Sequence, residues 1–239
     1  MPGQLIIERQ PGRWTFTLDR PEKRNALSQE IVEALIEGIE AAHQEGVPLL
    51  VFCGAGKNLS AGFDFTDYEA QSEGDLVLRM VRIETLLQLV ANSPALTVGL
   101  ARGKNFGAGV DLFAACKLRY CTPDASFRMP GLKFGLVLGT RRFRNIVGAD
   151  KAMSILGTAR AFNADESLLI GFVTAIVPEN EWADILSEAE AAAAVLDPET
   201  RIALYGALNM NEADTDMAAL VRSASRPGLK QRIQQYLAG

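Results

Sequence analysis

The sequence predicts an α/β fold, and three observations support this prediction. Short apolar runs at residues 49–53 and 95–101 have the length and composition of buried strands. Segments with apolar residues at helical spacing alternate with such runs along most of the chain. Beyond Glu179 the periodic segments are all helical. We therefore expect an α/β core at residues 1–178 and a C-terminal helical region at residues 179–239.

The first half of the chain reads as two strands, a helix and further strands separated by one more helix. A turn at Pro11-Gly12 separates the first two strands, and Ser28 is suited to cap the first helix. The predicted elements are strands at 5–7 and 14–18, a helix at 28–44, a strand at 49–53, a mobile loop at 66–74, a helix at 75–92 and a strand at 95–101.

The second half continues the alternation and then becomes helical. The predicted elements are a helix at 107–116, a strand at 118–121, short pieces at 126–127 and 134–136, helices at 142–147, 151–156 and 165–170, a strand at 172–177, and helices at 183–196, 202–210, 216–224 and 229–237. Their order favours a sheet core followed by a helical tail.

Composition excludes several classes of function. The 239 residues carry a net charge of −5 without a basic stripe, which gives no electrostatic argument for nucleic-acid binding. No apolar run reaches membrane-spanning length, and no signal peptide opens the chain. The three cysteines lie in apolar runs, as is typical of reduced core thiols. We expect a cytoplasmic protein that binds neither nucleic acid nor membrane and holds no metal.

Two turns rich in small residues follow two predicted strands. Gly107-Ala108-Gly109 opens a helix that carries Asp111, and Ser60-Ala61-Gly62 follows the strand at 49–53. Glycine allows close backbone approach, and helix N-termini present free N–H groups to an anion. Two such turns can aim one N–H each at the same oxygen. Asp111, one turn into its helix, is placed to move a proton nearby. The alternative is a tight packing contact, with Asp111 stabilised by the helix dipole.

Four segments of the chain match the motifs of one family. They are Arg20-Pro21-Glu22-Lys23-Arg24-Asn25-Ala26-Leu27, Ser60-Ala61-Gly62-Phe63-Asp64, the stretch from Gly103 to Cys116, and the run from Gly157 through Phe162-Asn163-Ala164 to Gly171-Phe172-Val173. In their order and spacing they resemble the crotonase family, also called the enoyl-CoA hydratase/isomerase family. The resemblance extends over about residues 5–178. It implies the ClpP/crotonase fold, a spiral of ββα units, followed by a C-terminal helical region that forms a homotrimer or hexamer.

The resemblance also implies a chemistry. Members of the family hold the thioester oxygen of an acyl-CoA with two backbone N–H groups and so stabilise an enolate. At the matching positions the donors would be the N–H groups of Ala61 and Ala108. Coenzyme A would arrive as part of the substrate, with no permanently bound cofactor. The residues along it would be Lys23, Arg24, Ala26, Ala61, Asp64 and Phe65.

The acidic residues depart from the family pattern. Asp111 stands at the position of the first catalytic glutamate, and Gly131 stands at that of the second. Because glycine has no side chain that can give or take a proton, ordinary hydration with two glutamates is disfavoured. A single-acid isomerase, a decarboxylase or a related lyase is favoured, with Asp111 or the loop residues Asp67 and Glu69 moving the proton. The alternative is a weak or inactive acyl-CoA-binding member, or a non-catalytic partner in a hetero-oligomer.

A pair of arginines, a group of glycines and the lone histidine also bear on the function. Arg141 and Arg142 either bind an anion or pair with acidic residues at a subunit contact, and we favour the pairing. The glycines at 103, 107 and 109 lack the spacing of a dinucleotide-binding turn. A serine hydrolase needs a base, and the lone histidine, His43, is expected in the last turn of a helix, where it serves the dipole.

Overall fold

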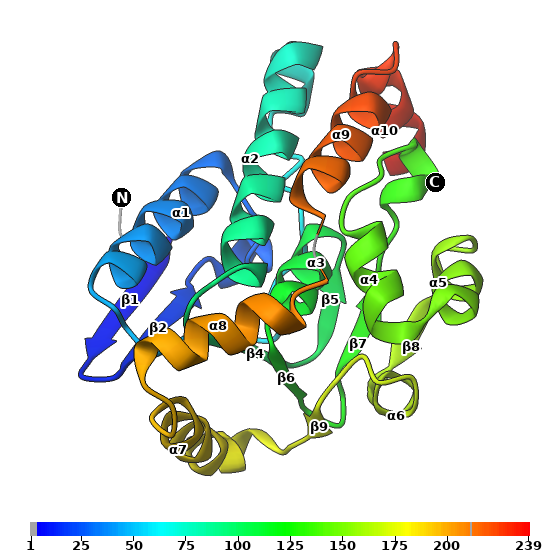
Figure 1. The fold of residues 1–239 in the computed structure, drawn as a ribbon. Helices are drawn as coiled ribbons and strands as arrows, with labels where there is room; N and C mark the ends of the chain where they lie inside the picture. The colour runs from blue at the N-terminus through cyan, green and yellow to red at the C-terminus, as the bar shows by residue number, and fades with distance from the viewer. Residues whose placement is uncertain (1–3, 211) are drawn as a thin grey trace.

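A six-stranded sheet and a smaller three-stranded sheet organise the chain, as a computed structural model shows for residues 4–210 and 212–239 (Figure 1). The first sheet has the order β1-β2-β3-β4-β6-β9, and only its β1–β2 pair is antiparallel. Its strands are β1 (Leu5–Gln10), β2 (Arg13–Leu18), β3 (Leu49–Gly54), β4 (Leu96–Ala101), β6 (Leu118–Cys121) and β9 (Ala175–Ile176). The second contains β5 (Lys104–Phe106), β7 (Ser126–Arg128) and β8 (Ala161–Asn163). The predicted α/β class is confirmed.

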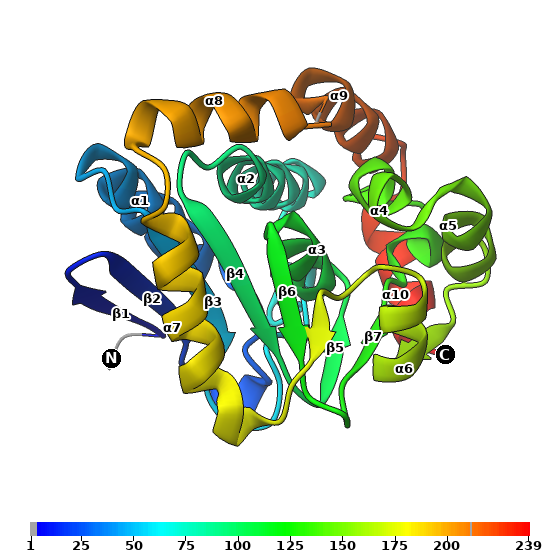
Figure 2. The ribbon, with the colours of Figure 1, turned by 60° about the horizontal axis from the view of Figure 1, so that its bottom comes forward.

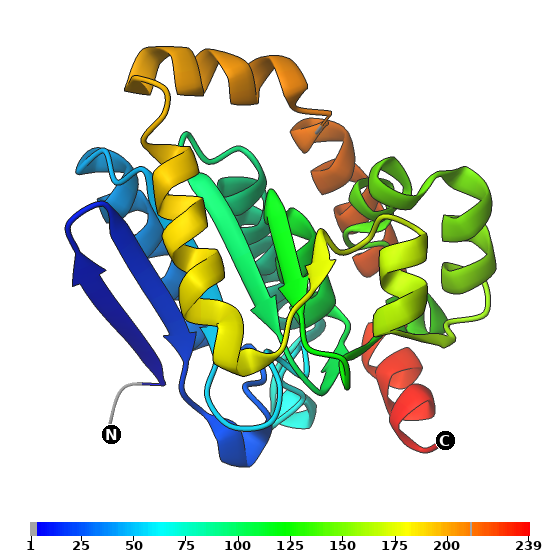
Figure 3. The same ribbon diagram turned by 90° about the horizontal axis from the view of Figure 1, so that it is seen from below.

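Helices cover both faces of the large sheet, which explains its continuously apolar strands. On one face lie α1 (Gln29–Gln44), α2 (Glu73–Ala91) and α3 (Ala108–Ala115), while α7 (Trp182–Ala193) crosses the other face (Figures 2 and 3). Successive residues of β3 point to opposite faces. Leu50 and Phe52 join the apolar cluster beneath α1 and α2, whereas Leu49 and Val51 join the cluster beneath α7.

The C-terminal helices complete the core. The remaining helices are α4 (Thr140–Val147), α5 (Ala149–Leu156), α6 (Ala164–Leu169), α8 (Pro198–Leu208), α9 (Ala213–Ala224) and α10 (Leu229–Leu237). Leu220 of α9 and Ile233 of α10 share an apolar cluster with Met80 of α2 and with Phe134. The helical content predicted for residues 179–239 is therefore present, and α9 and α10 pack against the α/β part.

One predicted strand is shorter than expected, and two short strands were missed. The strand expected at 172–177 is only two residues long, because the amides of Phe172 and Val173 donate to the Ser167 carbonyl at the end of α6, at 2.8 and 3.2 Å. The three-residue strands β5 and β8 were not predicted, since they are too short to show periodicity. Among the described residues, no helix combines the length and the apolar character needed to span a membrane.

Candidate active site

A cavity of about 470 Å³ lies where the two turns rich in small residues meet α10 and the 3-10 turn η3 (Gly131–Phe134). Its walls include residues 61, 63–66 and 106–108 from the two turns, Asp111 from α3, and Tyr236 and Leu237 from α10. The cavity therefore depends on elements from both the α/β part and the C-terminal helices.

Close contact between the two turns requires glycine. A Cβ atom on Gly109 would lie 2.6 Å from the Ser60 Cβ, and one on Gly62 would lie 2.5 Å from the Phe106 carbonyl oxygen. Gly62 also has a φ of +84°, a conformation that other residues adopt at a cost. The Phe106 N–H donates to the Ser60 carbonyl at 3.1 Å and joins the turns directly.

The expected oxyanion donor at Ala61 is not available. Its N–H donates to the carbonyl of Arg24 at 2.8 Å, so the prediction of a free amide at this position is wrong. The Phe63 and Ala108 amides, by contrast, have no acceptor within the described residues. The Ala108 nitrogen would be only 3.1 Å from a Cβ on Gly62, the residue bonded to Phe63. The two free amides thus lie close together at the cavity wall.

A single backbone bridge explains why Phe63 rather than Ala61 is free. Leu27 donates to the Gly62 carbonyl at 2.7 Å and accepts from the Asp64 amide at 3.3 Å. In such a parallel bridge the residue between the two bonded groups directs its own N–H away from its neighbour. The sequence carries no signal for this bridge, because the partners are far apart along the chain.

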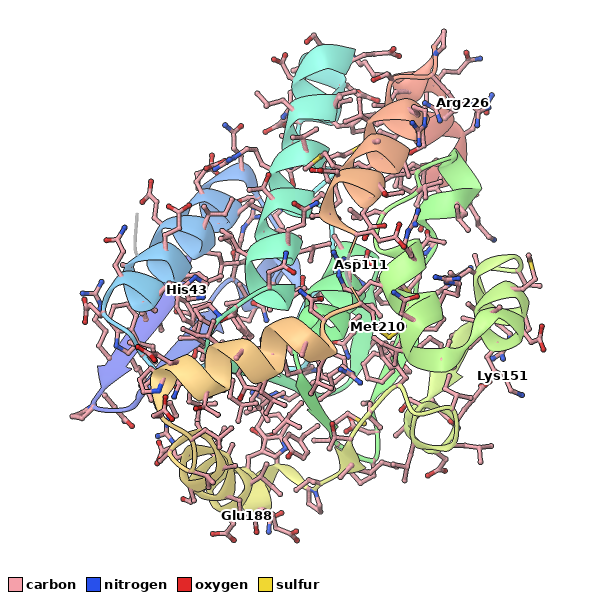
Figure 4. All side chains as sticks on the ribbon, viewed as in Figure 1. His43, Asp111, Lys151, Glu188, Met210 and Arg226 are labelled. Atoms are coloured by element: carbon pink, nitrogen blue, oxygen red, sulfur yellow. The ribbon has the colours of Figure 1, made fainter. Side chains whose placement is uncertain are left out.

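Asp111 faces the cavity from the first turn of α3 and lies in the interior of the molecule (Figure 4). Its side chain is only 3% exposed, and within the described residues its Oδ1 is buried without a hydrogen-bond partner. A Cβ on Gly139 would lie 1.9 Å from this oxygen, so only glycine fits there. Burial raises the pKa of Asp111 well above its usual range; the charge of Arg142 opposes this shift and that of Glu84 adds to it.

Asp111 is the one carboxyl group suited to proton transfer among the described residues that line the cavity. Glu22 is exposed, and Asp64 is paired with Arg20. Burial alone would raise the pKa of Asp64, but hydrogen bonds from Arg20 and Thr66 lower it below its usual value. Gly131 occupies the wall, and Asp67 and Glu69 do not line it.

The residues expected to contact coenzyme A all border this cavity. Lys23 and Arg24 are exposed at its mouth, and neither has an ion-pair partner in the described part of the chain. Ala26, Ala61, Asp64 and Phe65 line the wall nearby. Their proximity agrees with the expectation, whereas contact with coenzyme A itself stays a prediction.

Two aromatic residues at the cavity were missed from the sequence. Phe134 lies 6.1 Å from Phe65 between ring centroids, and Tyr236 lies 5.1 Å from Phe134. Phe134 lies in η3, three residues after Gly131, in a turn too short to show periodicity. Tyr236 lies on α10, where an aromatic residue on an amphipathic helix looks like any core residue, so no sequence signal distinguishes it.

Asn25 stabilises the loop that carries Lys23 and Arg24. It is fully buried with a φ of +54°. Its Nδ2 donates to the carbonyls of Ala55 and Asn58, both at 2.9 Å, and its Oδ1 accepts from the Arg20 amide at 3.0 Å. The asparagine of the early motif is therefore a structural residue that fixes the cavity mouth.

We expect Asn25→Ala to lower the free energy of unfolding by about 3 kcal/mol, because it removes three buried hydrogen bonds and leaves alanine in a left-handed conformation. Urea unfolding followed by circular dichroism measures the change. Asn145→Ala, which removes exposed hydrogen bonds, is the matched control and should change stability by less than about 0.5 kcal/mol. Equal effects of the two variants would contradict the structural role.

The two arginines pair with acidic residues of the same chain. Arg141 contacts Glu212 at 2.6 Å and Asp216 at 2.9 Å, and the buried Arg142 contacts Glu84 at 3.2 Å. Pairing with acidic residues was the favoured expectation, and the partners lie within the chain rather than across a subunit contact. Neither arginine lines the main cavity.

His43 and the cysteines lie outside the cavity. His43 is in the last turn of α1 (Figure 4). Its Nε2 lies 2.8 Å from the Ser93 hydroxyl. Burial raises the pKa of Cys116 to about 12 and that of Cys121 to about 11, as expected for inert thiols. Within the described residues, no group of three or more histidine, cysteine, aspartate or glutamate side chains is arranged to hold a metal.

Comparison with known proteins finds similarity to enoyl-CoA hydratases and isomerases. The family model for enoyl-CoA hydratase/isomerase matches residues 8–227. The mitochondrial Delta(3,5)-Delta(2,4)-dienoyl-CoA isomerase of Rattus norvegicus is 31% identical over 79% of this chain, which spans 62% of that protein's length. The probable enoyl-CoA hydratase echA6 of Mycobacterium leprae is 32% identical over 74% of each chain.

Solved structures agree with the family model. A crystal structure from Bordetella parapertussis, assigned as an enoyl-CoA hydratase/isomerase, is 68% identical with a TM-score of 0.98 and covers 99% of both chains. The enoyl-CoA hydratase of Bacillus halodurans is 22% identical with a TM-score of 0.85, covering 98% of this chain and 100% of its own. The second likeness concerns the fold alone.

Proposed function

We propose that this chain, which belongs to the enoyl-CoA hydratase/isomerase family, moves a double bond along the acyl chain of an enoyl-CoA thioester. One observation carries the proposal: among the described residues that line the cavity, one carboxyl group is buried with an unpartnered oxygen, and it shares the cavity with two backbone amides that have no acceptor there. An isomerisation needs one group that removes and returns a proton, and it consumes no water. The dienoyl-CoA isomerase among the relatives is consistent with this reaction.

The amides of Phe63 and Ala108 would hold the thioester oxygen. Each preorganised donor of this kind stabilises the developing negative charge by about 3 kcal/mol. With a 3-enoyl-CoA, ionised Asp111 would remove a proton from the α-carbon, and the C–H electron pair would delocalise into a dienolate. The dienolate would take the proton back from Asp111 at the γ-carbon, which leaves a 2-enoyl-CoA and the ionised carboxylate.

Hydration needs more than this site offers. Adding water across a double bond requires one group to activate the water and another to protonate the α-carbon. Gly131 supplies neither, and Asp64 is held by Arg20. Decarboxylation is a second candidate that one observation favours: burial raises the pKa of Asp111, which favours the protonated form that could supply a proton to the enolate left when carbon dioxide departs.

The direct test is turnover of three thioesters by the purified protein. We expect a 3-enoyl-CoA to become a 2-enoyl-CoA, detected by the absorbance of the conjugated product. We expect no 3-hydroxyacyl-CoA from a 2-enoyl-CoA, as measured by liquid chromatography. Release of carbon dioxide from a malonyl-type CoA would favour the second candidate. Binding of all three without turnover would contradict both and favour a non-catalytic acyl-CoA-binding protein.

The pH dependence distinguishes the two roles of Asp111. As a base for isomerisation it must be ionised, so kcat/KM should rise with pH through its raised pKa. As the acid in decarboxylation it must be protonated, so kcat/KM should fall over the same range. Rate profiles for each substrate measure the sign. Asp64→Asn is the control and should leave the position of the profile unchanged.

We also propose a homotrimer or hexamer. The apolar side chains of Ile202, Leu204, Leu208 and Met210, in and just after α8, are between 41% and 69% exposed, which suits burial against another subunit. Light scattering measures the assembly, and a monomer would contradict the proposal.

A further inference from the structure

Three buried charged residues from three helices form one cluster behind the cavity. Asp111 comes from α3, Glu84 from α2 and Arg142 from α4, and they are 3%, 1% and 5% exposed. Arg142 Nη2 lies 3.2 Å from Glu84 Oε1, which also accepts a hydrogen bond from Gln88 at 3.1 Å. The mechanism proposed above uses only Asp111.

The backbone of α4 connects Arg142 to Asp111. Gly139, immediately before α4, is packed so tightly on Asp111 that a Cβ would overlap the Oδ1 atom. Arg142 follows three residues later, one helical turn along the same face. A change at Arg142 can therefore reach the carboxyl group through space and through the helix start that confines it.

The cluster holds one positive charge for two carboxyl groups. Removing charges from water is costly, so a buried carboxylate needs a partner or takes up a proton. The Nε and Nη1 atoms of Arg142 and the Oδ1 atom of Asp111 are all buried without a partner in the described residues. The Arg142 guanidinium donates to Glu84 through Nη2, which leaves its Nε and Nη1 donors without an acceptor in the described residues.

We propose that Arg142 is a positioning residue shared by Glu84 and Asp111, and that its pairing with Glu84 favours the protonated form of Asp111. The inference rests on the proposed function only in treating Asp111 as the proton carrier. The neighbouring charges on α4 and α9 form their own group, in which Arg141 is bound by Glu212 and Asp216. Asp216 acts weakly on Glu84, and burial is the main reason that the pKa of Glu84 is raised.

The test is a pH titration of Asp111 by difference infrared spectroscopy, which needs no turnover. The carbonyl band of the protonated acid is assigned by its loss in Asp111→Asn. In Glu84→Gln the titration should move to lower pH, because a negative charge near Asp111 is lost and the guanidinium is released. In Arg142→Met it should move to higher pH, because the positive charge that opposes the effect of burial is lost.

Three further variants control for unfolding, for the charge of Arg142 and for changes outside the cluster. Arg142→Met leaves Glu84 buried without its partner and risks unfolding, so the double variant Glu84→Gln with Arg142→Met provides a charge-balanced substitute. It should titrate at higher pH than Glu84→Gln alone. Arg142→Lys keeps the positive charge and should move the titration less than Arg142→Met. Arg141→Met removes an adjacent arginine outside the cluster and should leave the titration in place.

The direction in which each variant shifts the pH titration of Asp111 tests the inference. Shifts of the same sign in Glu84→Gln and in the variants lacking Arg142, or no shift in either, would overturn the inference. If the shifts occur as stated while no thioester is turned over, the charge arrangement stands and the proposed function fails. Where turnover is found, the pH profile of kcat/KM should move in the same directions as the infrared titration.

Discussion

Replacing Asp111 with asparagine should lower kcat by about a thousandfold while leaving thioester affinity within a few-fold of wild type. General acid–base catalysis contributes about 10²- to 10⁴-fold, and the structure offers no second carboxyl group suited to the task among the described cavity residues. Asparagine keeps the shape of the side chain but cannot carry the proton. Steady-state kinetics with a 3-enoyl-CoA gives kcat, and calorimetric titration with a non-reactive acyl-CoA gives the affinity.

The loop variant Glu69→Gln is the matched control, because Glu69 was a candidate from the sequence and lies outside the cavity wall. It should retain full activity. Full activity of Asp111→Asn would contradict the assignment of Asp111. Loss of activity in Glu69→Gln instead would move the proton transfer to the loop.

The same substitution should also increase stability at high pH. Because the folded protein raises the pKa of Asp111, its contribution to stability is full below the unfolded pKa and is lost as the pH rises through the folded pKa. Asparagine does not ionise, so Asp111→Asn should have the higher Tm in alkaline buffer, and this advantage should shrink in mildly acidic buffer. Such a gain in stability with a loss of rate is typical of a catalytic group.

Gly62→Ala should reduce kcat by about a hundredfold or more. The added Cβ would lie 2.5 Å from the Phe106 carbonyl oxygen and 3.1 Å from the Ala108 nitrogen, so the two turns must separate. Separation moves the Phe63 and Ala108 amides apart, and losing one such donor costs about 10²- to 10³-fold in kcat. Gly109→Ala should have a similar effect, because its Cβ would lie 2.6 Å from that of Ser60.

A control must distinguish the loss of kcat caused by separating the two amides from the cost of backbone strain alone. Gly12 has a φ of +82°, almost that of Gly62, but a Cβ there would meet nothing within 4 Å. Gly12→Ala therefore carries the same conformational cost, about 1–2 kcal/mol, without any displacement at the cavity. It should lose stability and keep its kcat. If Gly62→Ala folds and matches Gly12→Ala in kcat, the two amides do not act together.

The oxyanion site was predicted only in part from the sequence. The two turns and their small residues were identified from local pattern and Ala108 from the family resemblance, and the structure brings these turns into contact. The choice of Ala61 was wrong, because its N–H is used by the Arg24 carbonyl. Which amide stays free depends on the bridge between Leu27 and Phe63, a contact between distant segments that leaves no trace in either segment.

The sequence by itself determined the α/β class, the order of the major helices and strands, the family and the absence of a glutamate at position 131. The class and the order of elements follow from periodicity and turn chemistry, whereas the family and the missing glutamate follow from the resemblance of the motifs; both are local properties of the sequence. Only the tertiary structure decided that Phe63 rather than Ala61 has a free amide, that Arg142 is paired with Glu84 near Asp111, and that α10 forms part of the cavity wall. The physical reason is that hydrogen-bond satisfaction and burial depend on contacts between residues far apart in the chain, and these exist only once the chain has folded.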